Sequence, residues 1–278
     1  MADIRQILDD ISENAPVVSD RRRLLYQTAR AAALTLIPFG LVNSAKAQGP
    51  SPEERVADAM NVLIRLAHML SDFYKQGLET KGLIPEGPNR EALKTIYKHK
   101  QVHTAIMWHV IKAQHGIPNP TDSYDFTGGN GSAGGPYPNV MNNSAAFLEL
   151  AQVMEDVAIR AFKAQTGNLV SDNSAIEVAH RIHTTCGRHA AKIRMIRREL
   201  GADIKPWITE KISGIDNEAA KEMYEGEQNT MQETFGGLVD MRHLNGNQTI
   251  NLQVATEAFD EPVFEAETLK FVNLFTLR

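Results

Sequence analysis

The chain has 278 residues, of which 42% are hydrophobic and 23% are charged, and its mean hydropathy is -0.30. This composition is that of an ordinary globular protein and excludes a disordered or membrane-embedded chain. The formal charge of -5 and the pI near 6.0 offer no general attraction for phosphate backbones, so no nucleic-acid partner is expected.

Residues 1–47 have the order of a cleavable export signal, with arginines at 21–23, an apolar run at 31–42 and small residues up to Ala47. The segment DRRRLL at 20–25 resembles a twin-arginine signal. Because the apolar run is shorter than the roughly 20 residues that a membrane-spanning helix needs, no permanent membrane anchor is expected after cleavage. The pattern predicts an exported protein, periplasmic or extracellular; the alternative is an amphipathic N-terminal helix of a cytosolic protein.

Apolar residues recur with helical periodicity after the signal, which predicts four long helices at about 53–78, 90–115, 144–165 and 173–200. Residues 116–143 are rich in Gly, Pro and Asn and form a long second-to-third connection. One apolar stripe per helix favours an all-α fold, a four-helix bundle with a long crossover connection, over residues 48–200. Residues 201–278 are predicted to be a partly helical C-terminal extension packed on the bundle, with helices near 217–235 and 265–274.

Polar residues lie near the middle of three of these stripes, where a plain bundle would have Leu or Ala. They are Lys100 and His103 in the second helix, Glu155 in the third, and Cys186 and His189 in the fourth. Isolated charges are costly to bury, so we expect these groups to meet one another or a metal. Bundle-core metal sites use Glu-x-x-His pairs, and here the histidine half of each pair is present without its carboxylate.

Several motifs of the chain resemble those of exported bacterial ferritin-like domain proteins, which are also similar to plant desiccation-related proteins. The motifs are DFYKQGL, HKQVH, YDFTGG, AQVMEDVAIRAFKAQ, RIHTTCGRHAAKIR, KPWIT and EAFDEP, in that order. The resemblance covers most of the chain after the signal. It implies a ferritin-like fold with a di-iron site in the bundle.

The resemblance also implies which residues hold metal in typical members. The matching ligand positions here are His103, Glu155 and His189. Typical members have Glu where this chain has Lys100 and Cys186, and the looser alignment of the first helix places a further Glu at Ala67. Three of four carboxylates are therefore replaced, and a di-iron pair needs several anionic oxygen ligands.

Two hypotheses follow. In the first, the di-iron site is degenerate: Lys100 pairs with Glu155, no cofactor is bound, and the protein is non-catalytic, with a structural, stress-related or interaction-mediating role. It would act as a homo-oligomer or with another exported protein. In the second, a single Fe or Zn ion is held by His103, Glu155 and His189, with His99 or Cys186 as a further ligand. That set would suit a metal-binding protein or a non-haem metal oxidoreductase.

Other residues receive simpler interpretations. Cys186 is more simply a small buried hydrophobe, the commoner fate of a lone cysteine in a helix. His109 is expected at the surface. The basic run KIRMIRREL is expected to form a solvated helix face, with Lys192, Arg194, Arg197 and Arg198 near the C-terminal end, where the helix dipole favours positive charge.

Overall fold

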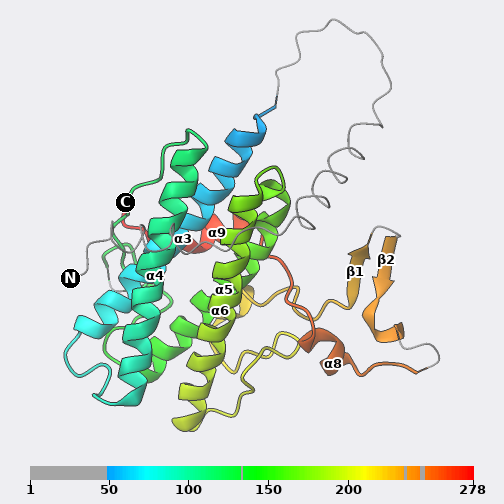
Figure 1. Cartoon of the computed structure of the whole chain (residues 1–278). Coiled ribbons are helices and arrows are strands. Elements are labelled where there is room, and N and C mark those ends of the chain that lie inside the picture. Colours follow the sequence, from blue (N-terminus) through cyan, green and yellow to red (C-terminus); the bar gives the residue numbers. More distant parts are fainter. Residues whose placement is uncertain (1–48, 133, 235–236, 245–247) are drawn as a thin grey trace, which may run out of the picture. The chain divides into compact units, whose positions relative to one another are not determined.

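The computed structural model describes residues 49–132, 134–234, 237–244 and 248–278. The expected export signal at 1–47 lies outside the described residues. Four long helices pack side by side (Figure 1): α3 (Pro52–Glu79), α4 (Pro88–Ala113), α5 (Ser144–Leu169) and α6 (Asn173–Glu199). The predicted four-helix bundle is confirmed, with helix bounds close to those expected from periodicity.

Connection lengths decide which helices are neighbours. Short loops join α3 to α4 and α5 to α6, and these two pairs share the most extensive packing. The residues between α4 and α5 form the predicted long crossover, which brings α5 against α3 and leaves α6 against α4. Each of the four helices therefore has one face directed at a shared core.

The helix starts follow from local chemistry. Ser51 and Glu54 form a reciprocal capping box at the start of α3, because the Ser51 hydroxyl accepts from the Glu54 backbone N–H while the Glu54 carboxylate accepts from that of Ser51. The side chains of Asn143 and Asp172 accept from backbone N–H groups in the first turns of α5 and α6. Pro88 opens α4, a position where its missing N–H costs nothing.

An aromatic cluster holds the crossover against the bundle. The rings of Phe73 and Phe147 are stacked with centroids 4.5 Å apart, and Phe126 of the crossover meets Phe73 edge-on at 5.1 Å. Gly77 makes this possible, since a Cβ there would lie 2.2 Å from the Phe147 ring. Phe275, at the end of the terminal helix α9 (Glu265–Phe275), contacts Phe126 with ring centroids 5.9 Å apart. The core thus ties sequence-distant segments together.

The C-terminal segment is mixed. It contains α7 (Glu218–Glu222), β1 (Met231–Thr234), β2 (Gly237–Asp240), the 3-10 turn η1 (Met241–His243), α8 (Leu252–Glu257) and α9 (Glu265–Phe275). Strands β1 and β2 pair antiparallel, with Met231 opposite Asp240. The terminal helix α9 is as predicted and packs on α3 and α5.

The predicted helix at 217–235 is wrong beyond its first turn. Helix α7 ends at Glu222, and Gly226 follows with a φ of +95°, a conformation that a helix excludes. The chain then enters the hairpin. Among the described residues, no helix combines the length and the apolar character needed to cross a membrane.

Candidate functional site

Five buried polar side chains meet at the centre of the bundle, with every helix contributing. They are Tyr74 from α3, Lys100 from α4, Glu155 from α5, and Cys186 and His189 from α6. We call them the central cluster. All five are at least 96% buried. Burial of ionisable groups to this degree requires that they compensate one another.

Lys100 and Glu155 form the ion pair expected from the sequence. Lys100 Nζ lies 2.6 Å from Glu155 Oε2, and the Tyr74 hydroxyl donates to Glu155 Oε1 at 2.9 Å. The same ammonium lies 3.4 Å from Cys186 Sγ. The pairing of Lys100 with Glu155 is therefore confirmed, and the ammonium lies between the carboxylate and the thiol.

The electrostatics favour the ionised pair. Burial raises the pKa of Glu155, but the charge of Lys100 together with His189 outweighs it and brings the pKa to about 2. Burial lowers the pKa of Lys100, and Cys186 and Glu155 reverse this, so that pKa is raised. Burial raises the pKa of Cys186 to about 11, so the sulfur is a thiol at neutral pH. Glu155 is therefore a carboxylate and Lys100 an ammonium.

His189 links the cluster to the surface. Its Nδ1 lies 3.4 Å from Glu155 Oε2 and has no hydrogen-bond partner among the described residues. Its Nε2 lies 2.9 Å from Nδ1 of His99, which is exposed on α4, and one of these two nitrogens donates to the other. Burial, then the positive charges around it, lowers the pKa of His99. His99 and His189 thus form a chain of polar side chains that leads from solvent to Glu155.

The structure places the sequence-predicted ligands unequally. The ligand atoms of Glu155, Cys186 and His189 all lie within 4.8 Å of one another, and these three residues form a group of donors that could hold one metal ion. His103 is buried beside it, with its ring centroid 6.2 Å from that of His189. Burial and the nearby Lys100 charge lower the pKa of His103 to about 3, so its imidazole is neutral. His99 reaches the group through His189.

Ala67 and Tyr74 show what sequence reasoning missed on α3. Ala67 is a buried apolar residue with no ligand to offer, as its identity requires. Tyr74 lies two helical turns further along and supplies the α3 contact to Glu155. Its place on the apolar stripe was a usable signal, because a buried tyrosine hydroxyl needs a hydrogen-bond partner.

The residues present do not fit a di-iron pair. Two iron ions need several anionic oxygen ligands to offset and bridge them, and Glu155 is the one carboxylate of the central cluster. An ammonium 2.6 Å from that carboxylate repels any cation beside it. Instead, the negative charge of Glu155 at the bundle centre is balanced by Lys100 of the same chain.

A second buried set of polar residues lies on the outer side of α5 and α6. We call this set the lateral network; it consists of Gln152, Asp156, Arg194, Arg197 and Tyr224. Arg194 donates twice to Asp156, at 2.8 and 2.5 Å, and the Tyr224 hydroxyl donates to the same carboxylate at 2.7 Å. Arg197 donates to Gln152 at 2.5 Å.

The lateral network corrects one sequence-based expectation. Arg194 and Arg197 are 3% and 5% exposed, so the basic run is a solvated face only at Arg198 and in part at Lys192. The reason is that the C-terminal segment covers this side of α6, and Arg197 also donates to the Gly214 carbonyl at 2.8 Å. His109 is exposed, as expected.

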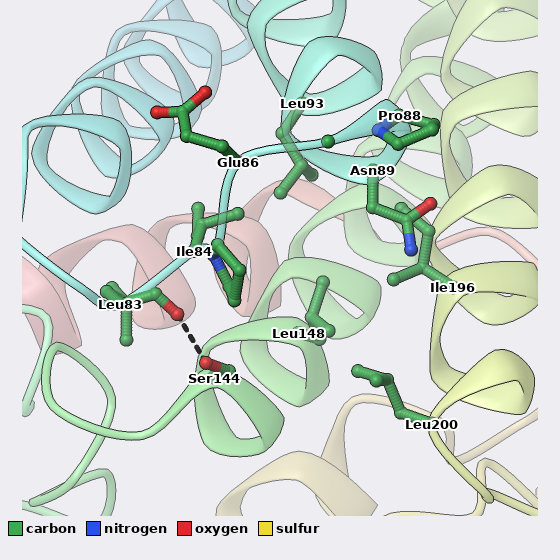
Figure 2. A pocket seen from close by; sticks show the side chains of 12 residues that line it. Leu83, Ile84, Glu86, Pro88, Asn89, Leu93, Ser144, Leu148, Ile196 and Leu200 are labelled. Atoms are coloured by element: carbon green, nitrogen blue, oxygen red, sulfur yellow. Dashed lines mark hydrogen bonds between the residues drawn. The ribbon is translucent and has the colours of Figure 1, made fainter.

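An apolar pocket of about 220 Å³ lies at one end of the bundle (Figure 2). Its lining consists of Leu83, Ile84, Pro85, Glu86, Gly87, Pro88, Asn89, Leu93, Ser144, Leu148, Ile196 and Leu200. Leu93 precedes Lys100, and Leu148 precedes Glu155, by seven residues, or about 10 Å along a helix. Along these helices the buried residues Ile96, Ala151 and Ile193 lie between the pocket positions and the cluster positions, and no residue belongs to both sets. The pocket is therefore distinct from the central cluster.

A four-helix bundle with a long crossover, and with polar residues from all four helices meeting at its centre, defines the ferritin-like class of folds. The family model described as "Ferritin-like domain" matches residues 55–199, slightly more than half of the chain, and the chain belongs to this family. No curated protein matches the chain closely enough to count as a relative.

Proposed function

We propose that this chain is a ferritin-like protein in which Lys100 replaces the metal, and that it acts as a structural or interaction protein rather than as a ferroxidase. The observation that carries the proposal is the 2.6 Å contact between Lys100 Nζ and Glu155 Oε2, between side chains that are 2% and 0% exposed. A stress-related role, as the desiccation-related resemblance implies, is compatible with a bundle that needs no iron supply.

The charge balance of the site supports this proposal. A carboxylate buried at the bundle centre needs a positive charge beside it, which a metal ion would otherwise provide. Lys100 supplies that charge from within the chain, and Tyr74 donates to the other carboxylate oxygen. The bundle is then complete as folded, independent of iron supply.

Metal content tests the proposal directly. We expect chain purified without chelators from iron- and zinc-supplemented cells to contain far less than one metal ion per molecule, and to oxidise Fe²⁺ no faster than buffer. The matched comparison is the double variant Lys100→Glu with Cys186→Glu, which restores two of the replaced carboxylates. Two iron ions per unaltered chain would overturn the proposal. One ion per chain would instead support the alternative with His103, Glu155 and His189 as ligands.

The site of action is proposed to lie outside the cytoplasm. The order of residues in 1–47 supports a twin-arginine-like signal. We expect the chain expressed in a bacterial host to appear in the periplasm or medium, with a mature N-terminus after Ala47 that mass spectrometry can identify. Replacing both Arg22 and Arg23 by Lys should hold the chain in the cytoplasm. If both the unaltered chain and this variant stay in the cytoplasm at full length, the proposed export is wrong.

A further inference from the structure

We infer that Glu155, Cys186 and His189 form a latent site for one divalent, thiophilic cation such as Zn²⁺ or Co²⁺, which the Lys100 ammonium keeps closed. This inference deepens the proposed function, in which Lys100 stands in for a metal. It concerns a mononuclear donor set with a thiolate, which differs from a carboxylate-bridged pair of irons.

One spacing among the donor atoms matches that of a tetrahedral site. Ligand atoms about 2.1 Å from a tetrahedral ion stand roughly 3.4 Å apart. His189 Nδ1 lies 3.4 Å from Glu155 Oε2, and all three ligand atoms lie within 4.8 Å of one another. Lys100 Nζ, at 2.6 Å from Glu155 Oε2 and 3.4 Å from Cys186 Sγ, lies among these donors. A cation can take that place only if the amine leaves it.

One donor already lacks a partner. His189 is 4% exposed, yet its Nδ1 has no hydrogen-bond partner among the described residues and faces Glu155. Buried ring nitrogens are normally hydrogen-bonded. The other ring nitrogen is held by His99 at 2.9 Å, which fixes the orientation of the ring in the way that outer groups orient metal-binding histidines. The unpartnered nitrogen therefore points into the donor group.

Counting charges selects a divalent ion. In the folded chain the carboxylate of Glu155 and the ammonium of Lys100 balance each other. Without the amine, a divalent ion with a carboxylate, a thiolate and a neutral imidazole also sums to zero, and the thiol proton leaves as the metal binds. A monovalent or trivalent ion would leave a net charge in the core.

The donor types select among divalent ions. A thiolate and an imidazole suit zinc and its substitute cobalt, whereas Mg²⁺ and Ca²⁺ require oxygen ligands. The three protein donors leave a fourth position that water can fill in the space of the removed lysine stem. The site is therefore expected to discriminate strongly between Zn²⁺ and Mg²⁺.

The test replaces Lys100 and adds metal to the full chain. We expect the Lys100→Ala variant to bind one Co²⁺ per chain, with a thiolate-to-cobalt charge-transfer band, and at least about a hundredfold more tightly than the unaltered chain, because a like charge has been removed from the site. Zn²⁺ should displace the Co²⁺ and abolish the band, and excess Mg²⁺ should not. Bound Co²⁺ or Zn²⁺ should also raise the melting temperature of the variant.

Two controls separate this site from incidental binding. Lys98→Ala removes an exposed lysine from the same helix and should leave cobalt binding as weak as in the unaltered chain. Adding Cys186→Ser to Lys100→Ala should remove the charge-transfer band and most of the affinity. Because Cys186 is the one cysteine of the sequence, the affinity decides: if the double variant binds Co²⁺ as tightly as Lys100→Ala does, the ion is not held by Cys186 and the inference is wrong.

A second variant covers a failure to fold. Lys100→Gln removes the charge but keeps a donor for Glu155, and it is measured in the same way. If the folded Lys100 variants bind Co²⁺ no better than Lys98→Ala does, the inference fails while the proposed function stands. If the unaltered chain itself binds one ion as tightly as the variants, Lys100 does not close the site, and both fail.

Discussion

The central cluster and the lateral network are both buried and charged, and both are built on α5, yet they use adjacent residues for opposite purposes. Glu155 points into the bundle, and Asp156, about 100° further round the helix, points to the C-terminal segment. Asp156 accepts three hydrogen bonds, two of them from one guanidinium. The network pairs its groups thoroughly and joins two parts of the fold.

The central cluster is less fully paired. Its thiol is contacted by an ammonium at 3.4 Å, and one imidazole nitrogen has no hydrogen-bond partner among the described residues. Purely structural polar networks tend to satisfy every member. Stability alone therefore explains the lateral network, whereas the central cluster keeps donor groups that stability does not require.

The largest effect is expected in the lateral network. Arg194→Ala leaves the buried carboxylate of Asp156 without its cation, and breaking a buried pair in this way should lower the free energy of unfolding by about 4 kcal/mol. Urea denaturation followed by circular dichroism measures it. The exposed Arg198→Ala is the matched control and should change stability by less than about 0.5 kcal/mol. A loss below about 1 kcal/mol for Arg194→Ala would show that the network is not a structural clamp.

In the central cluster, a second substitution should repair the first. Lys100→Met should cost about 3 kcal/mol, since it strands the Glu155 carboxylate. Adding Glu155→Gln removes that charge and still offers an oxygen to Tyr74, so the double variant should regain most of the loss. In the lateral network, Asp156→Asn should repair Arg194→Ala only in part, because it removes the stranded charge but does not replace the two guanidinium hydrogen bonds or the volume of the arginine side chain. Equal rescue at both places would remove the distinction between them.

Acid should weaken the central cluster. The folded-state pKa of Glu155, about 2, lies below its ordinary value of 4.5, so its contribution is fully present above pH 4.5 and is lost as the pH falls through 2. We expect the unaltered chain to lose about 2 kcal/mol more than Glu155→Gln does between pH 5 and pH 2. Denaturant midpoints measured across that range give the difference. Parallel pH profiles for the two chains would contradict an ionised Glu155.

Rising pH should lower the stability of the chain through Glu227, which lies outside the central cluster. Glu227 has a pKa raised to about 8 by burial, although Arg160 Nε lies 2.7 Å away and donates to the Glu261 carbonyl. The folded state keeps a proton that the unfolded state releases above 4.5, so stability falls as the pH rises from 4.5 to 8. Glu227→Gln should remove that dependence, which amounts to about 2 kcal/mol of unfolding free energy between pH 6 and pH 8. Glu225→Gln, at an exposed carboxylate, should leave the slope unchanged.

The bundle could be predicted from sequence because each long helix has its own periodic stripe, which is a local signal. The same stripes brought Lys100 and Glu155 to facing positions, so their pairing was predictable too. The burial of Arg194 and Arg197 was not, because it depends on Tyr224 and Gly214 of a segment with no strong periodicity. From sequence alone, an arginine on a helix is expected to face solvent unless another segment is known to cover that face of the helix.

Two further errors have local causes that a sequence conceals. The helix expected at 217–235 has helix-forming residues at its start, but Gly226 adopts a positive φ and the chain turns into a hairpin. Tyr74 looked like one more core aromatic, and its hydroxyl became a site group only when Glu155 was placed across from it at 2.9 Å. Such contacts between distant elements are set by packing rather than by spacing.

The smallest change in stability is expected at His99, the exposed end of the polar chain that leads to Glu155. His99 is exposed and holds the buried His189 ring through a single 2.9 Å contact. His99→Gln should therefore cost less than about 1 kcal/mol of stability while freeing the His189 ring to turn, which NMR of the imidazole protons would show as a shifted and broadened His189 signal. His109→Gln, exposed on the same helix, should leave that signal unchanged. A sharp, unshifted His189 signal in His99→Gln would mean that the central cluster orients His189 by itself. The contact between His99 and His189 would then contribute packing only.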